Sequence, residues 1–444
     1  MTQTKPEGKT ASPASSVEFS NTLEFAKQMD AQDALRKYRF EFCFPRSGER
    51  SQALYFAGNS LGLAPVNARK YINEELDDWA HFGVEGHFES RHPWLSYHEL
   101  VTAMSARLVG ALPEEVVAMN SLTVNLHLML VSFYKPTKER FKIAIESDTF
   151  PSDRYAVQSQ ARFHGFDAAE AILSITPRAG EDLLQEKDIL DFIEKHGKEL
   201  NILLLGNVNY LTGQAFDLAK IAAACHSQGC IFGVNLAHGV GNLVLHLHDD
   251  DVDFAVWCSY KYLNSGPGGI AGCFIHQKHG QNLERPRFAG WWGHNKETRF
   301  KMGPEFDPLP GAEGFQLSNP PIFQLAALRA SLEYFDTIGM TNLRAKSELL
   351  TAYLEFVLLA IPGNFFSIIT PSDIAQRGAQ LSVRIKNSPQ NLLKQLQAKG
   401  AICDFRQPDI IRVTPAPLYC SFEDVFEFGQ ILDNLVNAVT VVKG

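Results

Sequence analysis

Short apolar runs alternate with helical patterns through the middle of the chain, from about residue 67 to residue 325. Helical spacing of apolar residues follows Thr123 and recurs over Leu218–Gln228, for which Asp217 is the expected N-cap. Between the helices, four apolar runs have the length and composition of buried strands: Phe141–Ile145, Ile202–Leu205, Cys230–Val234 and Phe254–Trp257. Such alternation is typical of a parallel sheet with helices on both faces.

A different pattern follows Pro321. Apolar residues recur there at three- and four-residue steps and predict a long helix with one buried face: Ile322, Leu325, Leu328 and Leu332. Beyond this helix, shorter segments predict a small α+β domain, with strands at Phe365–Ile369, Gln380–Ile385 and Ile410–Val413 and helices near Asn391–Lys399 and from Phe422.

At 444 residues the chain is long for one compact core, so we expect two main domains. Residues 1–20 are rich in Ser, Thr and Pro and lack the apolar stretch of a secretory signal, which predicts a disordered tail. An N-terminal segment is expected over residues 21–66, with a helix at Leu23–Tyr38 and a strand at Ala53–Phe56. A large domain then covers residues 67–320, and a linker helix with a small C-terminal domain covers 321–444.

Composition excludes several classes of protein. The net charge of −9 argues against a nucleic-acid surface, and no apolar run reaches the roughly 18 residues of a membrane span. The seven cysteines are scattered and odd in number, which favours a reducing compartment and predicts a cytoplasmic protein. No metal site is expected, because Cys225 and Cys230 lack a second ligand pair and the His246 to Asp251 segment is typical of a solvated edge.

The strongest chemical signal lies at Trp257–Lys261, which runs into a glycine-rich stretch from Gly266 to Gly272. Lys261 comes shortly after an apolar run, so its amine is expected at the edge of the sheet. Burial at such a place lowers the pKa of a lysine and makes it a nucleophile for Schiff-base formation. The alternative is a surface lysine beside a flexible loop. The glycines favour the nucleophile, because they let a ligand approach the backbone closely.

This loop resembles the cofactor-lysine loop of the kynureninase family. Further motifs of that family follow in the same order over about residues 50 to 430: Phe56–Leu63, Arg91–Trp94, Asn120–Asn125, Phe150–Asp153, Thr212–Gln214, Leu236–His238, Gly290–His294, Ser318–Pro321 and Ile411–Val413. Each motif is weak alone, and together they are highly specific.

The resemblance implies the α/β fold of type I pyridoxal-phosphate (PLP) enzymes, with a large domain on a mixed, mostly parallel sheet and a small α+β C-terminal domain. It implies pyridoxal 5'-phosphate as cofactor and a homodimer with shared active sites. The implied reaction is hydrolysis of the Cβ–Cγ bond of L-kynurenine or L-3-hydroxykynurenine, an amino-acid substrate of tryptophan catabolism and NAD biosynthesis. The products are alanine and anthranilate or 3-hydroxyanthranilate.

By the same resemblance, Lys261 and Tyr260 are the catalytic residues and also bind the cofactor. The other predicted cofactor-binding residues are Leu122, Thr123, Phe150, Pro151, Ser152, Asp153, Gly206, Asn235, His238, Trp291 and Asn319. The predicted substrate-binding residues are Ser60, His87, Asn319 and Arg412. Arg412 would hold the α-carboxylate, and Trp291 and Asn319 would reach the site from a neighbouring subunit. Judged locally, Leu122 and Thr123 also fit a plain helix start, and Phe150 and His238 also fit the core.

Two positions depart from the family pattern. Asn235 stands where the family has the aspartate that keeps the cofactor's ring nitrogen protonated, and Gly206 stands where a small hydroxyl residue or proline is common. Asparagine lacks the charge that favours a protonated ring, so we expect slower carbanion chemistry with cofactor binding retained. Two alternatives follow: a related enzyme with reduced or altered PLP chemistry, or a non-catalytic ligand-binding descendant.

Overall fold

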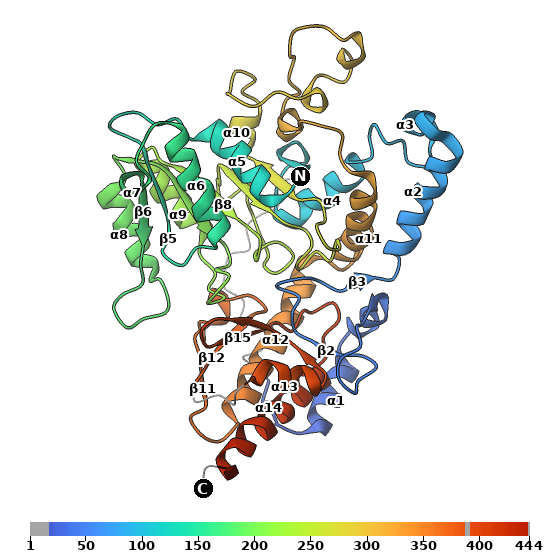
Figure 1. The fold of residues 1–444 in the computed structure, drawn as a ribbon, viewed down its shortest axis with the longest axis vertical. Helices are drawn as coiled ribbons and strands as arrows, with labels where there is room; N and C mark the ends of the chain where they lie inside the picture. Colours follow the sequence, from blue (N-terminus) through green and yellow to red (C-terminus); the bar gives the residue numbers. More distant parts are fainter. Residues whose placement is uncertain (1–16, 387–390, 443–444) are drawn as a thin grey trace.

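Seven strands form the central sheet of the larger part of the molecule, drawn in the upper half of Figure 1. The computed structural model describes residues 17–386 and 391–442. The strands run across the sheet in the order β4-β10-β9-β8-β7-β5-β6. Their bounds are Val116–Ala118 (β4), Lys142–Glu146 (β5), Ile172–Ile175 (β6), Leu200–Gly206 (β7), Ile231–Asn235 (β8), Phe254–Trp257 (β9) and Gly272–Ile275 (β10). Only β10 runs against its neighbours, so the sheet is mixed and mostly parallel.

Side chains alternate between the two faces of this sheet, and each face packs against its own helices. Ile143 and Ile145 of β5 belong to one hydrophobic core, with residues of α5 (Leu122–Phe133) and α6 (Pro151–Phe163). Ala144, between them, belongs to a second core. That core includes residues of α8 (Glu186–His196), α9 (Leu218–Ser227), α4 (Glu99–Val109) and α11 (Ile322–Ile338).

A four-stranded antiparallel sheet forms the smaller part of the molecule, at the lower end of Figure 1. Its order is β11-β12-β15-β14, with bounds Phe366–Ile368 (β11), Leu381–Ile385 (β12), Asp404–Arg406 (β14) and Ile410–Val413 (β15). Its helices are α12 (Met340–Leu359), α13 (Leu392–Ala398) and α14 (Phe422–Val442). The N-terminal segment joins this part, because α1 (Leu23–Gln32) packs on α14 and β2 (Leu54–Tyr55) pairs with β13 (Ala401–Ile402).

The remaining elements are short or peripheral. They are the strands β1 (Phe42–Cys43) and β3 (Ala64–Pro65) and the helices α2 (Ala68–Phe82), α3 (Gly86–Glu89), α7 (Ala168–Ala171) and α10 (Gln277–Gly280). Short 3₁₀ helices lie at Arg36–Glu41, Gly83–Glu85, Pro113–Glu115, Trp291–Gly293, Arg299–Lys301, Ala312–Phe315 and Ile374–Gln376.

The fold class predicted from the sequence is confirmed, and the predicted strands of the large sheet agree with the structure to within two residues at each end. Asp217 caps α9 as expected, accepting a hydrogen bond from Lys220 N at 3.2 Å. The helix predicted over Leu23–Tyr38 is too long. It ends at Gln32, because Asp33 is extended and pairs with Lys346 at 2.7 Å. Most of the predicted tail, residues 1–16, lies outside the described residues.

The longest described helices, α12 and α14, contain 20 and 21 residues. Among the described residues, no helix combines the length and the apolar character that a membrane span needs. All seven cysteines are free thiols, and all but Cys43 are buried.

Asp30 provides a test of how the N-terminal helix stabilises the C-terminal one. Its buried carboxylate accepts hydrogen bonds from Phe422 N at 2.8 Å and Glu423 N at 2.9 Å, at the start of α14. We expect Asp30→Ala to lower the free energy of unfolding by about 2–3 kcal/mol, since two helix N–H groups lose a charged acceptor.

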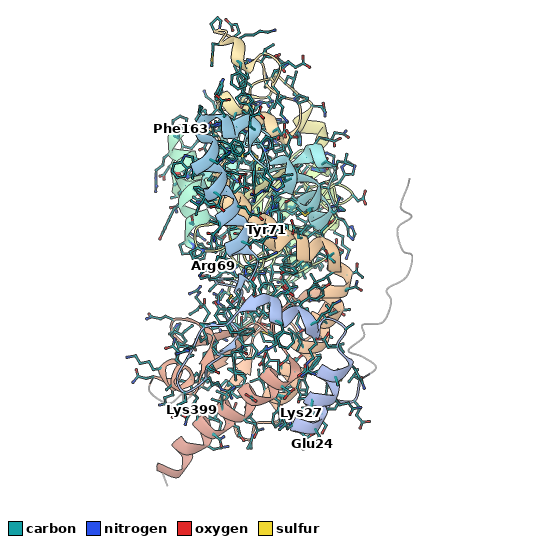
Figure 2. The ribbon with its side chains drawn as sticks, turned by 90° about the vertical axis from the view of Figure 1, so that its right-hand side faces the viewer. Glu24, Lys27, Arg69, Tyr71, Phe163 and Lys399 are labelled. Atoms are coloured by element: carbon teal, nitrogen blue, oxygen red, sulfur yellow. The ribbon has the colours of Figure 1, made fainter. Side chains whose placement is uncertain are left out.

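Urea unfolding of the two proteins measures this loss. Glu24→Ala is the matched control, because Glu24 is an exposed carboxylate of the same helix (Figure 2) and should shift stability little. Equal losses for the two variants would contradict the capping role of Asp30.

Candidate active site

A cavity of about 240 Å³ lies at the carboxyl ends of the parallel strands. Glu146, Gly206 and Asn235 are the last residues of β5, β7 and β8, and all three line it. Ligands of open parallel sheets bind at this edge. Two residues of the smaller part of the molecule, Arg406 and Arg412, complete the lining, so the cavity lies where the two parts meet.

Lys261 extends into this cavity from the loop that follows β9. Its Nζ lies 3.0 Å from Nε2 of His238 and 5.9 Å from the centre of the Phe150 ring. Burial lowers the pKa of Lys261, and burial together with the Lys261 charge lowers the pKa of His238 well below its ordinary value. The amine therefore has a neutral histidine as its neighbour and is easier to deprotonate than an exposed lysine. Burial raises the pKa of the adjacent Tyr260, so its phenol stays protonated at neutral pH.

Two helices begin at the cavity and form an anion cradle. Leu122 and Thr123 are the first residues of α5, and Ser152 lies in the first turn of α6. The hydroxyls of Thr123 and Ser152 are 2.8 Å apart, and both residues line the cavity. The free N–H groups and the positive ends of two helix dipoles, next to two hydroxyls, suit a phosphate group.

Asn235 and Asp153 form a buried pair on the cavity wall. Asn235 Nδ2 donates a hydrogen bond to Asp153 Oδ2 at 2.6 Å, and Asn235 Oδ1 accepts one from Ala237 N at 2.9 Å. Burial raises the pKa of Asp153 to about 6, against the opposing effects of the Asn235 hydrogen bond and the Lys261 charge. The pair is therefore a carboxyl group held by a neutral amide.

The close contact with Glu146 favours glycine at position 206. Glu146 Oε1 accepts a hydrogen bond from Gly206 N at 2.7 Å, and a Cβ atom at residue 206 would lie only 3.2 Å from that oxygen. Glu146 Oε2 accepts a second bond from Asn209 Nδ2 at 2.5 Å. A side chain at residue 206 would therefore require the buried Glu146 carboxyl group to move by a few tenths of an ångström.

Arg412 is buried and already has an acidic partner. Its Nη2 lies 2.6 Å from Asp404 Oδ2 and donates to Ser60 Oγ at 3.2 Å, while Nη1 donates to Tyr210 O at 2.7 Å. Ser60 Oγ also donates to Asp404, and Arg406 pairs with the other oxygen of Asp404 at 3.2 Å. Two guanidinium groups thus share one carboxylate beside the cavity.

Most of the site residues predicted from the sequence line this one cavity: Ser60, Leu122, Thr123, Phe150, Ser152, Asp153, Gly206, Asn235, His238, Tyr260, Lys261 and Arg412. Pro151 does not line it and occupies the first position of α6, where its fixed φ suits a helix start. Trp291 and Asn319 are exposed, His87 is half-buried, and none of the three lines the cavity.

The sequence reasoning missed several residues of the cavity and its surroundings: Asn59, Glu146, Thr149, Val208, Asn209, Tyr210, Ala237, Asp404 and Arg406. Two of them carried a usable signal. Asp404 and Arg406 precede Arg412 in a short hairpin, and Asp404 is paired directly with Arg412 across it. An opposite-charge pair at facing hairpin positions predicts contact. Glu146 directly follows the predicted strand Phe141–Ile145, but a single acidic residue at that place is not distinctive.

Comparison with known proteins points to one family. A family model described as the kynureninase C-terminal domain matches residues 343–432. The kynureninase of Myxococcus xanthus is 63% identical over 94% of this chain and 97% of its own length. The chain belongs to the kynureninase family.

Two further relatives are less similar in sequence, and two solved structures are similar in fold. Kynureninases of Koribacter versatilis and Nematostella vectensis are 55% and 48% identical over 93% and 94% of this chain, and over 97% and 94% of their own lengths. Among solved structures, a cysteine desulfurase of Escherichia coli has a TM-score of 0.73 at 16% identity, covering 91% of this chain and 98% of its own. One from Thermococcus onnurineus has 0.72 at 18%, covering 87% and 95%. These two structures share the fold.

The cavity fits the cofactor that the family resemblance implies. A phosphorylated pyridine aldehyde needs an amine, an anion cradle and polar groups for its ring, and Lys261, the starts of α5 and α6, and Asp153 supply them. His238 Nδ1 and Asp153 Oδ1 are buried atoms without a hydrogen-bond partner among the described residues. Buried polar atoms of this kind are normally satisfied, and a bound polar ligand would satisfy them.

Glu146 should make the stability of the protein depend on pH. Burial raises its pKa from 4.5 to about 7, so the folded state binds more protons than the unfolded state across this window. Stability therefore falls as the pH rises through it. Between pH 5 and pH 8, the wild type should lose roughly 3 kcal/mol of unfolding free energy relative to Glu146→Gln.

Urea unfolding at several pH values tests this expectation. The exposed residue Glu139 provides the matched control, since Glu139→Gln should keep the pH profile of the wild type. Parallel profiles for wild type and Glu146→Gln would show that Glu146 is not the titrating group.

Proposed function

We propose that this chain is a PLP-dependent hydrolase that cleaves the Cβ–Cγ bond of L-kynurenine and L-3-hydroxykynurenine. One water is consumed, and the products are alanine and anthranilate or 3-hydroxyanthranilate. The observation that carries the proposal is the Lys261 amine, 3.0 Å from a buried histidine and in the same cavity as Arg412. The high identity with several kynureninases over nearly the whole chain supports the same reaction.

In this proposal the starts of α5 and α6, with the hydroxyls of Thr123 and Ser152, would hold the cofactor's phosphate. Lys261 provides the amine for its aldehyde, and Phe150 and His238 bound the space for its ring. When bound, pyridoxal phosphate supplies an electron sink that stabilises negative charge on the substrate's α-carbon.

The chain's own residues then position the substrate and move its protons. Arg412 holds the α-carboxylate, which replaces Asp404 as a partner of the guanidinium. The Lys261 amine, with its lowered pKa, takes the proton from the α-carbon. Water attacks the carbon of the γ-carbonyl group, and the Cβ–Cγ bond breaks. The protonated phenol of Tyr260 is the nearby acid that gives a proton to the released β-carbon.

The two alternatives raised by Asn235 have less support. A protein that only binds ligands has no need of a buried amine with a lowered pKa beside a neutral histidine. A related enzyme with different PLP chemistry is harder to reconcile with 63% identity to a kynureninase. We therefore favour the hydrolase.

We further propose a cytoplasmic homodimer in which each cavity is completed by the partner subunit. Phe88, Phe300 and Trp291 form an exposed aromatic row, with ring centres 6.3 and 5.5 Å apart. His87 is adjacent to this row in sequence, and exposed Asn319 follows Leu317, whose carbonyl accepts from Trp292 N. Three of the predicted site residues that lie outside the cavity, His87, Trp291 and Asn319, thus lie in or near this aromatic row, as expected if they serve the site of a second copy.

A product assay tests the reaction. Purified protein with pyridoxal phosphate should convert L-kynurenine into equal amounts of alanine and anthranilate. Lys261→Ala should be at least about a thousandfold slower, because it lacks both nucleophile and base. Lys27→Ala is the control and should keep full activity, because Lys27 is an exposed lysine of α1 (Figure 2) that does not line the cavity. Bound cofactor without either product in the wild type would contradict the proposed reaction.

Mixing two defective variants tests the shared sites. Lys261→Ala and Asn319→Ala homodimers should each be impaired. A refolded mixture should regain up to about a quarter of wild-type activity, because half of its dimers are mixed and each has one intact site. No recovery, in a mixture proven to contain mixed dimers, would contradict a site shared between subunits.

A further inference from the structure

The cavity lining contains two carboxyl groups, Glu146 and Asp153. They differ in the number of hydrogen bonds that their oxygens already accept. Glu146 accepts a hydrogen bond on each oxygen, from Gly206 N and from Asn209 Nδ2. Asp153 accepts one, from Asn235 Nδ2 at 2.6 Å, and its Oδ1 is buried without a partner among the described residues. Asp153 is thus the acidic residue of the lining with an unused acceptor.

Asn235 is poorly suited to replace the aspartate that the family has at this position. Its Nδ2 is engaged by Asp153, and its Oδ1 is engaged by Ala237 N. Its side chain is therefore oriented by two protein contacts and carries no charge. What it does supply is a short hydrogen bond that fixes the Asp153 carboxylate and favours its ionised form.

We propose that in this chain Asp153 is the anionic partner of the cofactor's ring nitrogen, and that Asn235 is a positioning residue that orients Asp153. This inference rests on the proposed function, because it assumes pyridoxal phosphate in the cavity. The proton stays on the ring nitrogen and is donated to the carboxylate in a hydrogen bond, so no further acid or base is needed.

Charge balance in the cavity supports this assignment. Its lining carries the cationic groups Lys261, Arg406 and Arg412, and Asp404 pairs with both arginines. Of the two carboxyl groups in the lining, burial raises the pKa of Glu146 to about 7, whereas the charge of Lys261 lowers the pKa of Asp153, so Asp153 is the negative group coupled to Lys261. A protonated ring would add a second positive charge near Asp153 and stabilise its ionised form further.

Exchanging the two side chains provides the test. The variants are Asp153→Asn, which leaves two amides, and Asp153→Asn with Asn235→Asp, which moves the carboxylate to residue 235. Asp148→Asn is the matched control, since Asp148 is an exposed carboxylate nearby that does not line the cavity. The first readout is the ¹⁵N chemical shift of ring-labelled pyridoxal phosphate bound to each protein, which reports protonation of the ring nitrogen. The second is its dissociation constant.

We expect a protonated ring nitrogen in the wild type and in Asp148→Asn, and an unprotonated one in Asp153→Asn. Asp153→Asn should also bind the cofactor about tenfold to a hundredfold more weakly, as expected for a lost charged hydrogen bond. The exchanged pair should restore protonation. A ring nitrogen that stays protonated in Asp153→Asn, with affinity within about twofold of the wild type, would overturn the proposal.

A second measurement on the wild type covers the case in which Asp153→Asn does not fold. With ¹³C-labelled aspartate, the Asp153 carboxyl should titrate near pH 6 in the cofactor-free protein and remain ionised at pH 5 in the loaded protein. Unchanged titration on loading would overturn the proposal. None of these readouts requires turnover, so a wild type that forms no anthranilate would refute the proposed reaction and leave this inference to be judged separately.

Discussion

The parallel pairing of β5, β7 and β8 is the constraint on which the rest of the site depends. Its register places Gly206 directly beside Asn235, and Asn207 N donates to Asn235 O at 3.0 Å where the two strands end. Strands that run in the same direction end at the same edge, so three segments far apart in sequence bring their last residues to one place. The helices α5, which follows β4, and α6, which follows β5, begin at this edge too, which brings the anion cradle beside the lysine loop.

The smaller sheet closes this edge from the other side. The pairing of β14 with β15 sets Asp404 against Arg412, and the guanidinium then reaches across to Tyr210 O of the larger part. Asn59 Nδ2 makes a second connection, donating to Gln380 Oε1 at 2.8 Å, and Gln380 Nε2 donates to Tyr210 O at 3.1 Å. A substrate pocket built this way is bounded by a rigid sheet edge and by a separate unit held to it through polar contacts.

The sequence predicted the fold well where a strand is buried along its whole length, as for the four-residue strands β9 and β15, whose bounds agree with the predicted runs. It predicted the start of α14 at Phe422 as well. It failed where a tertiary contact affects the end of a helix. Asp33, whose ion pair with Lys346 accompanies the end of α1, is the example. Within the site, family motifs predicted most of the lining. Partners that depend on three-dimensional contact, such as Glu146 and Tyr210, have no distinctive local pattern and were found only in the structure.

The Asp404–Arg412 pair has a consequence for how ligands are recognised. The guanidinium already holds an internal carboxylate at 2.6 Å. In the function proposed above, where Arg412 binds the substrate's α-carboxylate, an incoming amino acid exchanges one ion pair for another. The contribution of this ion pair to binding is then the difference between two interactions of the guanidinium, one with the ligand's carboxylate and one with Asp404. The arginine stays ordered and compensated before the ligand arrives, and a molecule without a carboxylate gains nothing from it. Recognition at this position is therefore an ion exchange, in which the protein itself supplies the competing anion.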